Sequence, residues 1–133
     1  MTVVGIGTDL VSIQRIQGVV ERYGERFAAH VLTDREIADW RSHSHPTGFL
    51  AKRWAVKEAA AKALGTGIGA AVGFRDLVTT RTDAGAPELA VVGRGATTAR
   101  ILGVERWHVS TSDDGAYALA FVLAEGAPGG DAY

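Results

Sequence analysis

The chain has 133 residues, 47% of them hydrophobic and 22% charged, and its formal net charge is −1. This composition fits one globular domain, and the near-neutral charge argues against nucleic-acid binding. The absence of cysteine excludes disulfides, thiolate catalysis and cysteine-ligated zinc. The N-terminus does not resemble a signal peptide, and no apolar run approaches the ~20 residues of a membrane span, so we expect a cytoplasmic protein without a membrane partner.

The first elements are a strand and a helix. Residues 3–8 are β-branched and apolar, and they predict a strand in which Gly5 and Gly7 mark the close approach of a ligand or another backbone. Ser12 is placed to cap a helix with apolar residues at helical spacing, and this helix ends at Gly24.

A short apolar segment over 27–32 follows, and two further helices come after it. Thr33 and Glu36 form a capping box, which predicts a helix of about ten residues. After a polar loop, Pro46 suits the first turn of a helix that continues over 47–64 and is rich in strong helix formers.

The second half of the chain is dominated by hairpins. We expect a hairpin of strands 74–82 and 87–92, a helix at 96–102, and strands 107–112 and 117–124. Because the strands return through tight turns, the order predicts an α+β fold in which an antiparallel sheet packs against helices. We expect one domain over 1–125 and a flexible tail over 126–133.

The long helix carries a carboxylate and an ammonium on one face. Glu58 and Lys62 are four residues apart, so a hard cation and a phosphate could be held side by side. The simpler alternative is a surface ion pair worth ~0.3–0.5 kcal/mol. Asp9, at the end of the first strand, could supply a second carboxylate for magnesium, or it could be a helix cap or an Asx-turn at the strand–helix junction.

Other polar residues allow weaker interpretations. Gly65 and Gly67 suit a helix end, but they also let a phosphate approach the backbone. Arg15, Arg22 and Arg26 recur at spacings of seven and four, so they form either a solvated face or a surface for an acidic partner. The histidines at positions 43, 45 and 108 do not form a recognisable metal or triad motif.

Three stretches together resemble a known family: GIGTDLV at 5–11, FLAKRWAVKEAAAKALGTG at 49–67, and WHVS at 107–110. They are similar to the holo-acyl-carrier-protein synthases, the small homotrimeric phosphopantetheinyl transferases of bacterial fatty acid synthesis. The resemblance runs from Val3 to about Glu125 without a large insertion. It implies the 4′-phosphopantetheinyl transferase fold.

The resemblance also implies a reaction. A serine of apo acyl carrier protein attacks the β-phosphate of coenzyme A, the phosphopantetheine arm moves to the serine, and adenosine 3′,5′-bisphosphate leaves. At matching positions, Asp9 and Glu58 would hold Mg²⁺, and Lys62 would bind a coenzyme A phosphate. Glu58 or a metal-bound water would take the serine proton.

Further positions are implied for binding. Gly65, Gly67, Arg53 and Ser110 would contact coenzyme A in a cleft between subunits of the trimer, and Arg15 and Arg22 would dock the acidic helix of the carrier protein. Many relatives have histidine where this chain has Asp113, so no catalytic histidine is assigned. The rival hypothesis is a module that binds coenzyme A or an acidic partner without catalysis.

Overall fold

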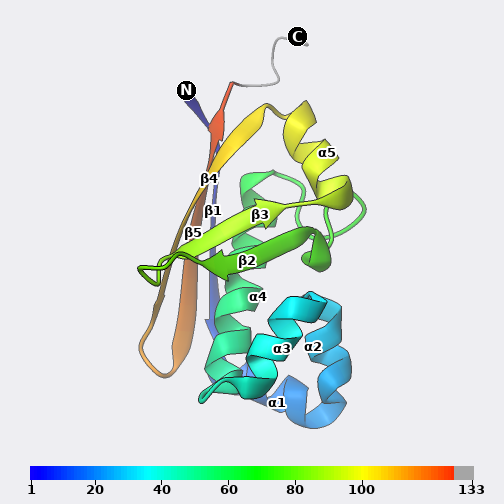
Figure 1. Ribbon diagram of the computed structural model, residues 1–133, viewed down its shortest axis with the longest axis vertical. Coiled ribbons are helices and arrows are strands. Elements are labelled where there is room, and N and C mark those ends of the chain that lie inside the picture. The colour runs from blue at the N-terminus through cyan, green and yellow to red at the C-terminus, as the bar shows by residue number, and fades with distance from the viewer. Residues whose placement is uncertain (128–133) are drawn as a thin grey trace.

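The computed structural model of the protein describes residues 1–127 and has the predicted α+β class (Figure 1). In chain order the elements are β1 (Thr2–Ser12), α1 (Ile13–Tyr23), α2 (Glu25–Val31), α3 (Asp34–Ser42), α4 (Pro46–Ala63), the 3₁₀ turn η1 (Phe74–Asp76), β2 (Leu77–Arg81), β3 (Pro87–Val91), α5 (Gly93–Ile101), β4 (Val104–Asp113) and β5 (Tyr117–Gly126). No helix within 1–127 is long and apolar enough to cross a membrane.

The main sheet has three antiparallel strands in the order β1-β5-β4. Its central strand, β5, pairs with β1 from Thr2 opposite Gly126 to Ser12 opposite Tyr117, so the two ends of the described chain lie together. The β2–β3 hairpin forms a separate two-stranded sheet. Figure 1 shows α4 running along the main sheet, with α1, α2 and α3 gathered at one end and α5 at the other.

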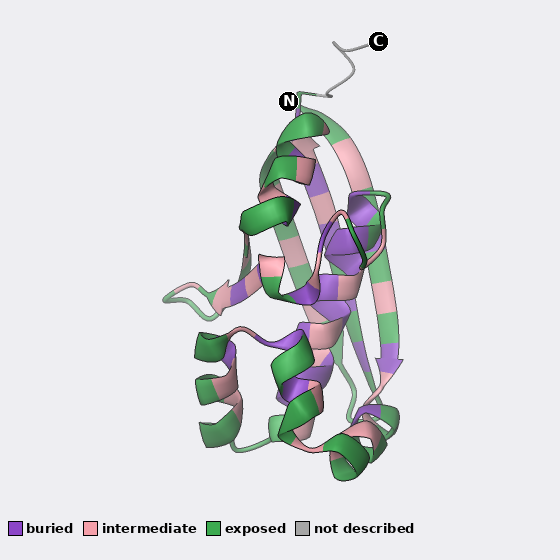
Figure 2. Cartoon of the chain, turned by 90° about the vertical axis from the view of Figure 1, so that its right-hand side faces the viewer, coloured by how far each residue is buried: buried purple, intermediate pink, exposed green. Residues whose placement is uncertain are grey.

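Helix α4 lies directly against β1 because the contact is made by glycines on β1 and alanines on α4. A Cβ atom on Gly7 would lie 1.8 Å from the Ala59 carbonyl oxygen, and one on Gly5 would lie 1.8 Å from that of Ala63. The predicted close approach at these glycines is therefore confirmed, and the approaching group is the backbone of α4. Figure 2 shows the buried residues concentrated in this central layer.

Local capping signals set the helix starts as predicted. The Ser12 hydroxyl accepts from the backbone N–H of Arg15 at 3.2 Å. In the capping box, Thr33 N donates to Glu36 Oε1 at 2.7 Å, and Glu36 N donates to Thr33 Oγ1 at 3.3 Å. Gly24 ends α1 with a φ of 60°, which favours glycine.

The structure also corrects several sequence-based boundaries. The segment 27–32 lies largely in α2, so four helices rather than three precede the first hairpin. Phe74–Asp76 is a 3₁₀ turn and not the start of β2. Asp9 lies inside β1, not at its end, and Gly126 completes β5, so the predicted tail cannot begin at 126; residues 128–133 of that tail lie outside the described residues.

A buried ionic network joins α4 to its neighbours. Lys57 is fully buried, and its Nζ donates to Glu36 Oε1 at 2.7 Å and to the Val31 carbonyl at 2.8 Å. The other Glu36 oxygen accepts from both the backbone N and the hydroxyl of Thr79. Because every Glu36 oxygen is paired, this network fixes α4 against α2, α3 and β2 in one arrangement.

Candidate functional site

The fold brings Asp9 of β1 and Lys62 of α4 together across 53 residues of chain. Lys62 Nζ lies 3.2 Å from Asp9 Oδ1 and donates to the Thr8 carbonyl oxygen at 2.8 Å. The Lys62 side chain therefore reaches from α4 to β1, where it pairs with Asp9. Lys62 does not form the surface ion pair with Glu58 that was the simpler alternative. Asp9 lies inside β1 and is not a helix cap.

Asp9 has one satisfied and one unsatisfied carboxylate oxygen. Only 15% of its side chain is exposed, and Oδ2 is buried without a hydrogen-bond partner. Buried carboxylate oxygens are normally paired, so an orphaned one indicates a site for a ligand that brings positive charge.

Glu58 completes a two-carboxylate cluster. Partial burial raises the pKa of Glu58 above 4.5, and the negative charge of Asp9 raises that pKa further, while Lys62 partly opposes the shift. Two such carboxylates suit Mg²⁺, which keeps several waters and takes few protein ligands when it also binds phosphates. Residues 1–127 contain no group of three or more histidine, cysteine or carboxylate side chains that could hold a metal ion by themselves.

Two glycines with positive φ follow the end of α4, next to Lys62. Gly65 and Gly67 have φ values of 77° and 66°, and their N–H groups donate to the carbonyls of Lys62 and Ala61. No atom lies within 4 Å of a Cβ placed on either residue. The helix-cap interpretation is therefore correct, and open space beside the same backbone leaves room for a ligand.

Arg53 and Ser110 do not join this cluster within one chain. Arg53 lies about 140° around α4 from Glu58, on the side that faces α3 and β2. Ser110 lies on β4 opposite Phe121 of β5 and is exposed on the sheet face that points away from α4.

Arg53 instead lines a hollow of about 580 Å³ together with Arg35 and Arg81. It is 6% exposed, and its Nε is buried without a partner. Burial and the charge of Arg81 lower the pKa of Arg53, whereas Glu36 and Asp39 oppose this effect. Sequence reasoning missed Arg35 and Arg81, because only the fold brings α3, α4 and β2 together here.

The arginines of α1 are displayed as predicted. Arg15 and Arg22 are exposed, point in nearly the same direction, and take part in none of the ion pairs of residues 1–127. Arg26 lies on α2, because Gly24 ends α1 before it. Its side chain lines a shallow hollow beside Tyr23.

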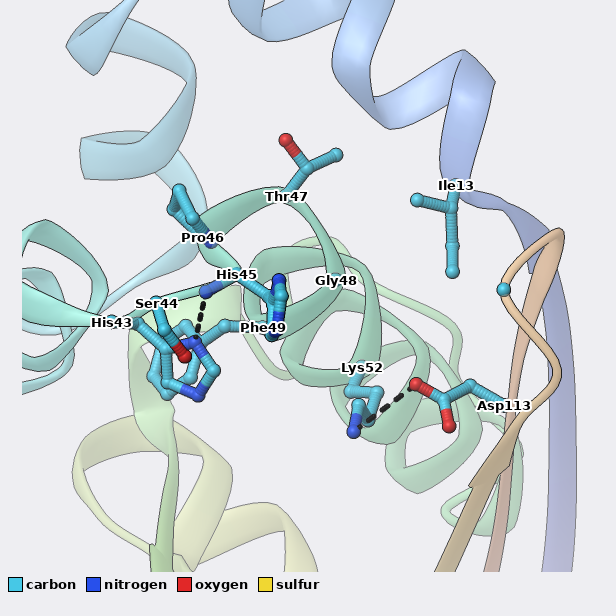
Figure 3. Close-up of a pocket in the computed structure, with 11 residues that line it drawn as sticks. Ile13, His43, Ser44, His45, Pro46, Thr47, Gly48, Phe49, Lys52 and Asp113 are labelled. Atoms are coloured by element: carbon cyan, nitrogen blue, oxygen red, sulfur yellow. Dashed lines mark hydrogen bonds and ion pairs between the residues drawn. The ribbon is translucent and has the colours of Figure 1, made fainter.

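Asp113 lies at the end of β4 and pairs with a lysine. Its Oδ2 is 3.2 Å from Lys52 Nζ, and both residues line a hollow of about 520 Å³ at the start of α4 (Figure 3). His43 and His45 lie on the same rim, where the backbone N–H of His45 donates to His43 Nδ1 at 2.9 Å. This hollow is not part of the Asp9 cluster.

Comparison with known proteins gives the context for this geometry. A family profile of the 4′-phosphopantetheinyl transferase superfamily matches residues 5–122. The chain is 47% identical over 123 residues to a protein of Hydrogenovibrio crunogenus named holo-[acyl-carrier-protein] synthase, an alignment that covers 92% of this chain and 97% of that protein.

Solved structures agree with the sequence comparison. The crystal structure of holo-[acyl-carrier-protein] synthase from Neisseria meningitidis is similar with a TM-score of 0.88 and 40% identity, covering 92% of this chain and 98% of that one. A holo-(acyl-carrier-protein) synthase of Bacillus anthracis in complex with CoA (3′,5′-ADP) has a TM-score of 0.80 and 32% identity, covering 96% and 100% of the two chains.

Proposed function

The chain belongs to the holo-[acyl-carrier-protein] synthases of the 4′-phosphopantetheinyl transferase superfamily, and from this premise we propose which reaction its site performs. The enzyme transfers the 4′-phosphopantetheine arm of coenzyme A to a serine of apo acyl carrier protein, depends on Mg²⁺, and releases adenosine 3′,5′-bisphosphate. The observation that carries this proposal is the cluster of Asp9, Glu58 and Lys62, in which one buried Asp9 oxygen lacks a partner.

Asp9 and Glu58 are the residues that would hold Mg²⁺. Two carboxylates with an orphaned oxygen fit a cation that completes its shell with water and diphosphate oxygens. When bound, the ion supplies positive charge that offsets the negative charge developing on the phosphate oxygens during transfer.

The remaining chemistry falls to side chains of this cluster. Lys62, which is half exposed, binds a phosphate of coenzyme A. Glu58, the second carboxylate of the cluster, accepts the serine proton as general base. The serine oxygen then bonds to the β-phosphorus, the bond to the bridging oxygen breaks, and its electron pair leaves with adenosine 3′,5′-bisphosphate.

Coenzyme A would also contact residues outside this cluster. Gly65 and Gly67 follow Lys62 along the chain, and the space beside their backbone is open to a ligand. Arg53, with its unpartnered Nε, suits an anionic group of coenzyme A, and Arg35 and Arg81 add positive charge to the same hollow. Because this hollow lies on another side of α4, we propose that it serves a site completed by a second copy of the chain.

The outer face of the main sheet supports a homotrimer with such shared sites. Large apolar side chains on β1 and β5 are exposed there, with Leu10 directly opposite Leu119 in the sheet. The exposed set on these two strands includes Ile6, Leu10, Tyr117, Leu119 and Phe121. A contiguous apolar face of this kind is typical of an interface, and it would carry Ser110 into the contact between copies.

The acyl carrier protein would dock on α1. Arg15 and Arg22 project together and keep their charges free for an acidic helix. We propose a cytoplasmic location, where coenzyme A and an acyl carrier protein would both be within reach, and we assign catalysis to one domain over 1–125.

Intact-mass spectrometry tests the proposal. An apo acyl carrier protein incubated with the protein, coenzyme A and Mg²⁺ should gain the mass of one phosphopantetheine, and EDTA should abolish the gain. A folded protein that binds coenzyme A but modifies none of several carrier proteins would instead be a binding module.

A further inference from the structure

Lys62 pairs with one oxygen of Asp9, Oδ1, while the other oxygen, Oδ2, is the one without a partner that the proposed metal would use. Lys62 Nζ is 3.2 Å from Asp9 Oδ1 and is held by a second acceptor, the Thr8 carbonyl at 2.8 Å. Glu58, four residues earlier on the same helix, is a possible partner that the ammonium does not take. Without substrate, the positive charge nearest to Asp9 is therefore Lys62.

A divalent cation and this ammonium compete for the same region. A cation coordinated by Asp9 would lie within a few ångströms of Lys62 Nζ, where like charges repel strongly in a partly buried setting. The side chain of Lys62 is 51% exposed, so it can swing away from β1. A phosphate that binds the ammonium would draw it off Asp9 and would add ligands for the cation.

We propose that Lys62 is a tethered counter-ion, which holds Asp9 when substrate is absent and releases it when the diphosphate of coenzyme A binds. This inference rests on the proposed function. Its consequence is that metal and coenzyme A bind cooperatively, because each favours the arrangement in which Lys62 has left Asp9. The metal alone then binds weakly, and the site is assembled only around a metal–diphosphate substrate.

The test measures metal affinity without catalysis. Metal-stripped protein is titrated with Mn²⁺, a spectroscopic probe for Mg²⁺, and free Mn²⁺ is followed by electron paramagnetic resonance. Lys62→Gln removes the counter-ion, and we expect it to bind Mn²⁺ about tenfold tighter than wild type in the absence of coenzyme A, the change expected for losing one competing charge-assisted hydrogen bond. A Lys62 that stays away from Asp9 in solution when substrate is absent predicts no such gain.

Lys52→Gln is the matched control. Lys52 lies on the same helix and makes an ion pair of the same 3.2 Å length, with Asp113, away from the site. It should bind Mn²⁺ as wild type does. Coenzyme A at saturating concentration should tighten Mn²⁺ binding to wild type and to Lys52→Gln alike.

Two results would overturn the inference. One is unchanged or weaker Mn²⁺ binding by Lys62→Gln, with Lys62→Met giving the same answer and circular dichroism showing both folded. The other is equal Mn²⁺ affinity of wild type with and without coenzyme A. If wild type still modifies the carrier protein in either case, the proposed function stands and only the counter-ion role of Lys62 fails.

Discussion

Substitution of Gly7 by alanine tests whether the contact between α4 and β1 positions the catalytic cluster. The new Cβ would lie 1.8 Å from the Ala59 carbonyl oxygen, whereas ordinary contact begins at 3.4 Å, a difference of 1.6 Å. The Ala59 oxygen belongs to the backbone of α4, and the Cβ is bonded directly to the backbone of β1, so neither atom can move aside without displacing its element. We therefore expect α4 to shift away from β1 by more than an ångström.

The magnitude follows from this shift. Overpacking of a core costs ~1–3 kcal/mol, and a backbone clash belongs at the upper end. With a urea m-value of roughly 1.5 kcal/mol/M, a loss of ~3 kcal/mol lowers the unfolding midpoint by about 2 M. Because Glu58 moves with α4 while Asp9 stays on β1, activity should fall about 100-fold even where the protein is folded.

The assay compares three proteins at one concentration: wild type, Gly7→Ala and Gly18→Ala. Gly18 is an exposed residue of α1 with open space around its Cβ position, so alanine there should be neutral or slightly stabilising. Urea unfolding gives stability, and carrier-protein modification in the absence of urea gives activity. A Gly7→Ala protein with the urea midpoint and activity of wild type would refute the reasoning.

Three further changes test the site, the buried network and the docking face. Glu58→Gln should lower the rate of transfer by at least about 100-fold. In EDTA the same variant should be more stable than wild type at pH 7, because the folded state raises the pKa of Glu58 and ionisation of this carboxyl therefore destabilises the wild-type protein as pH rises. Lys57→Met leaves Glu36 buried without its ammonium and should cost ~3–5 kcal/mol in urea unfolding. The double change Arg15→Glu and Arg22→Glu should raise KM for the carrier protein roughly tenfold or more at low salt, without changing KM for coenzyme A.

Each of these has a contrasting outcome. A Glu58→Gln variant that is less stable than wild type in EDTA, by the same amount at every pH, would contradict a raised pKa of Glu58. Arg41→Met, which removes an exposed pair with Glu25, should leave stability unchanged, so an equal effect of Lys57→Met would argue against the buried network. An unchanged KM for the carrier protein would move docking away from α1.

Sequence reasoning predicted the elements whose signals are local. Ser12 caps α1 and Gly24 ends it, while Thr33 and Glu36 begin α3, because each contact joins residues at most four apart. Helix α2 was missed because it has only seven residues and too little periodicity to separate it from a loop. The pairing of β1 with β5 joins the two ends of the described chain, and no local pattern indicates such a partner.

In the candidate site too, local features could be predicted from the sequence and contacts between distant residues could not. The sequence suggested that Asp9, Glu58 and Lys62 could act together, but spacing along a helix gave the wrong partner for Lys62, which pairs with Asp9 from another element. The buried pair of Lys57 and Glu36 had no sequence signal, since a lysine on a helix is normally solvated. In both cases the decisive contact spans 21 residues or more.

These contacts together explain how α4 can present Glu58 accurately while resting on glycine and alanine. Small residues allow a close approach to β1, but they interlock weakly and would let the helix rotate or slide. The hydrogen bonds of Lys57 to Glu36 and Val31 oppose such movement, because rotation would leave buried charges unpaired. Since Lys57 precedes Glu58 directly, the network that fixes Lys57 also fixes the direction in which Glu58 points. A variant that replaces both Lys57 and Glu36 with apolar residues should therefore regain stability relative to Lys57→Met without regaining full activity, and recovery of both would show that the pair serves stability alone.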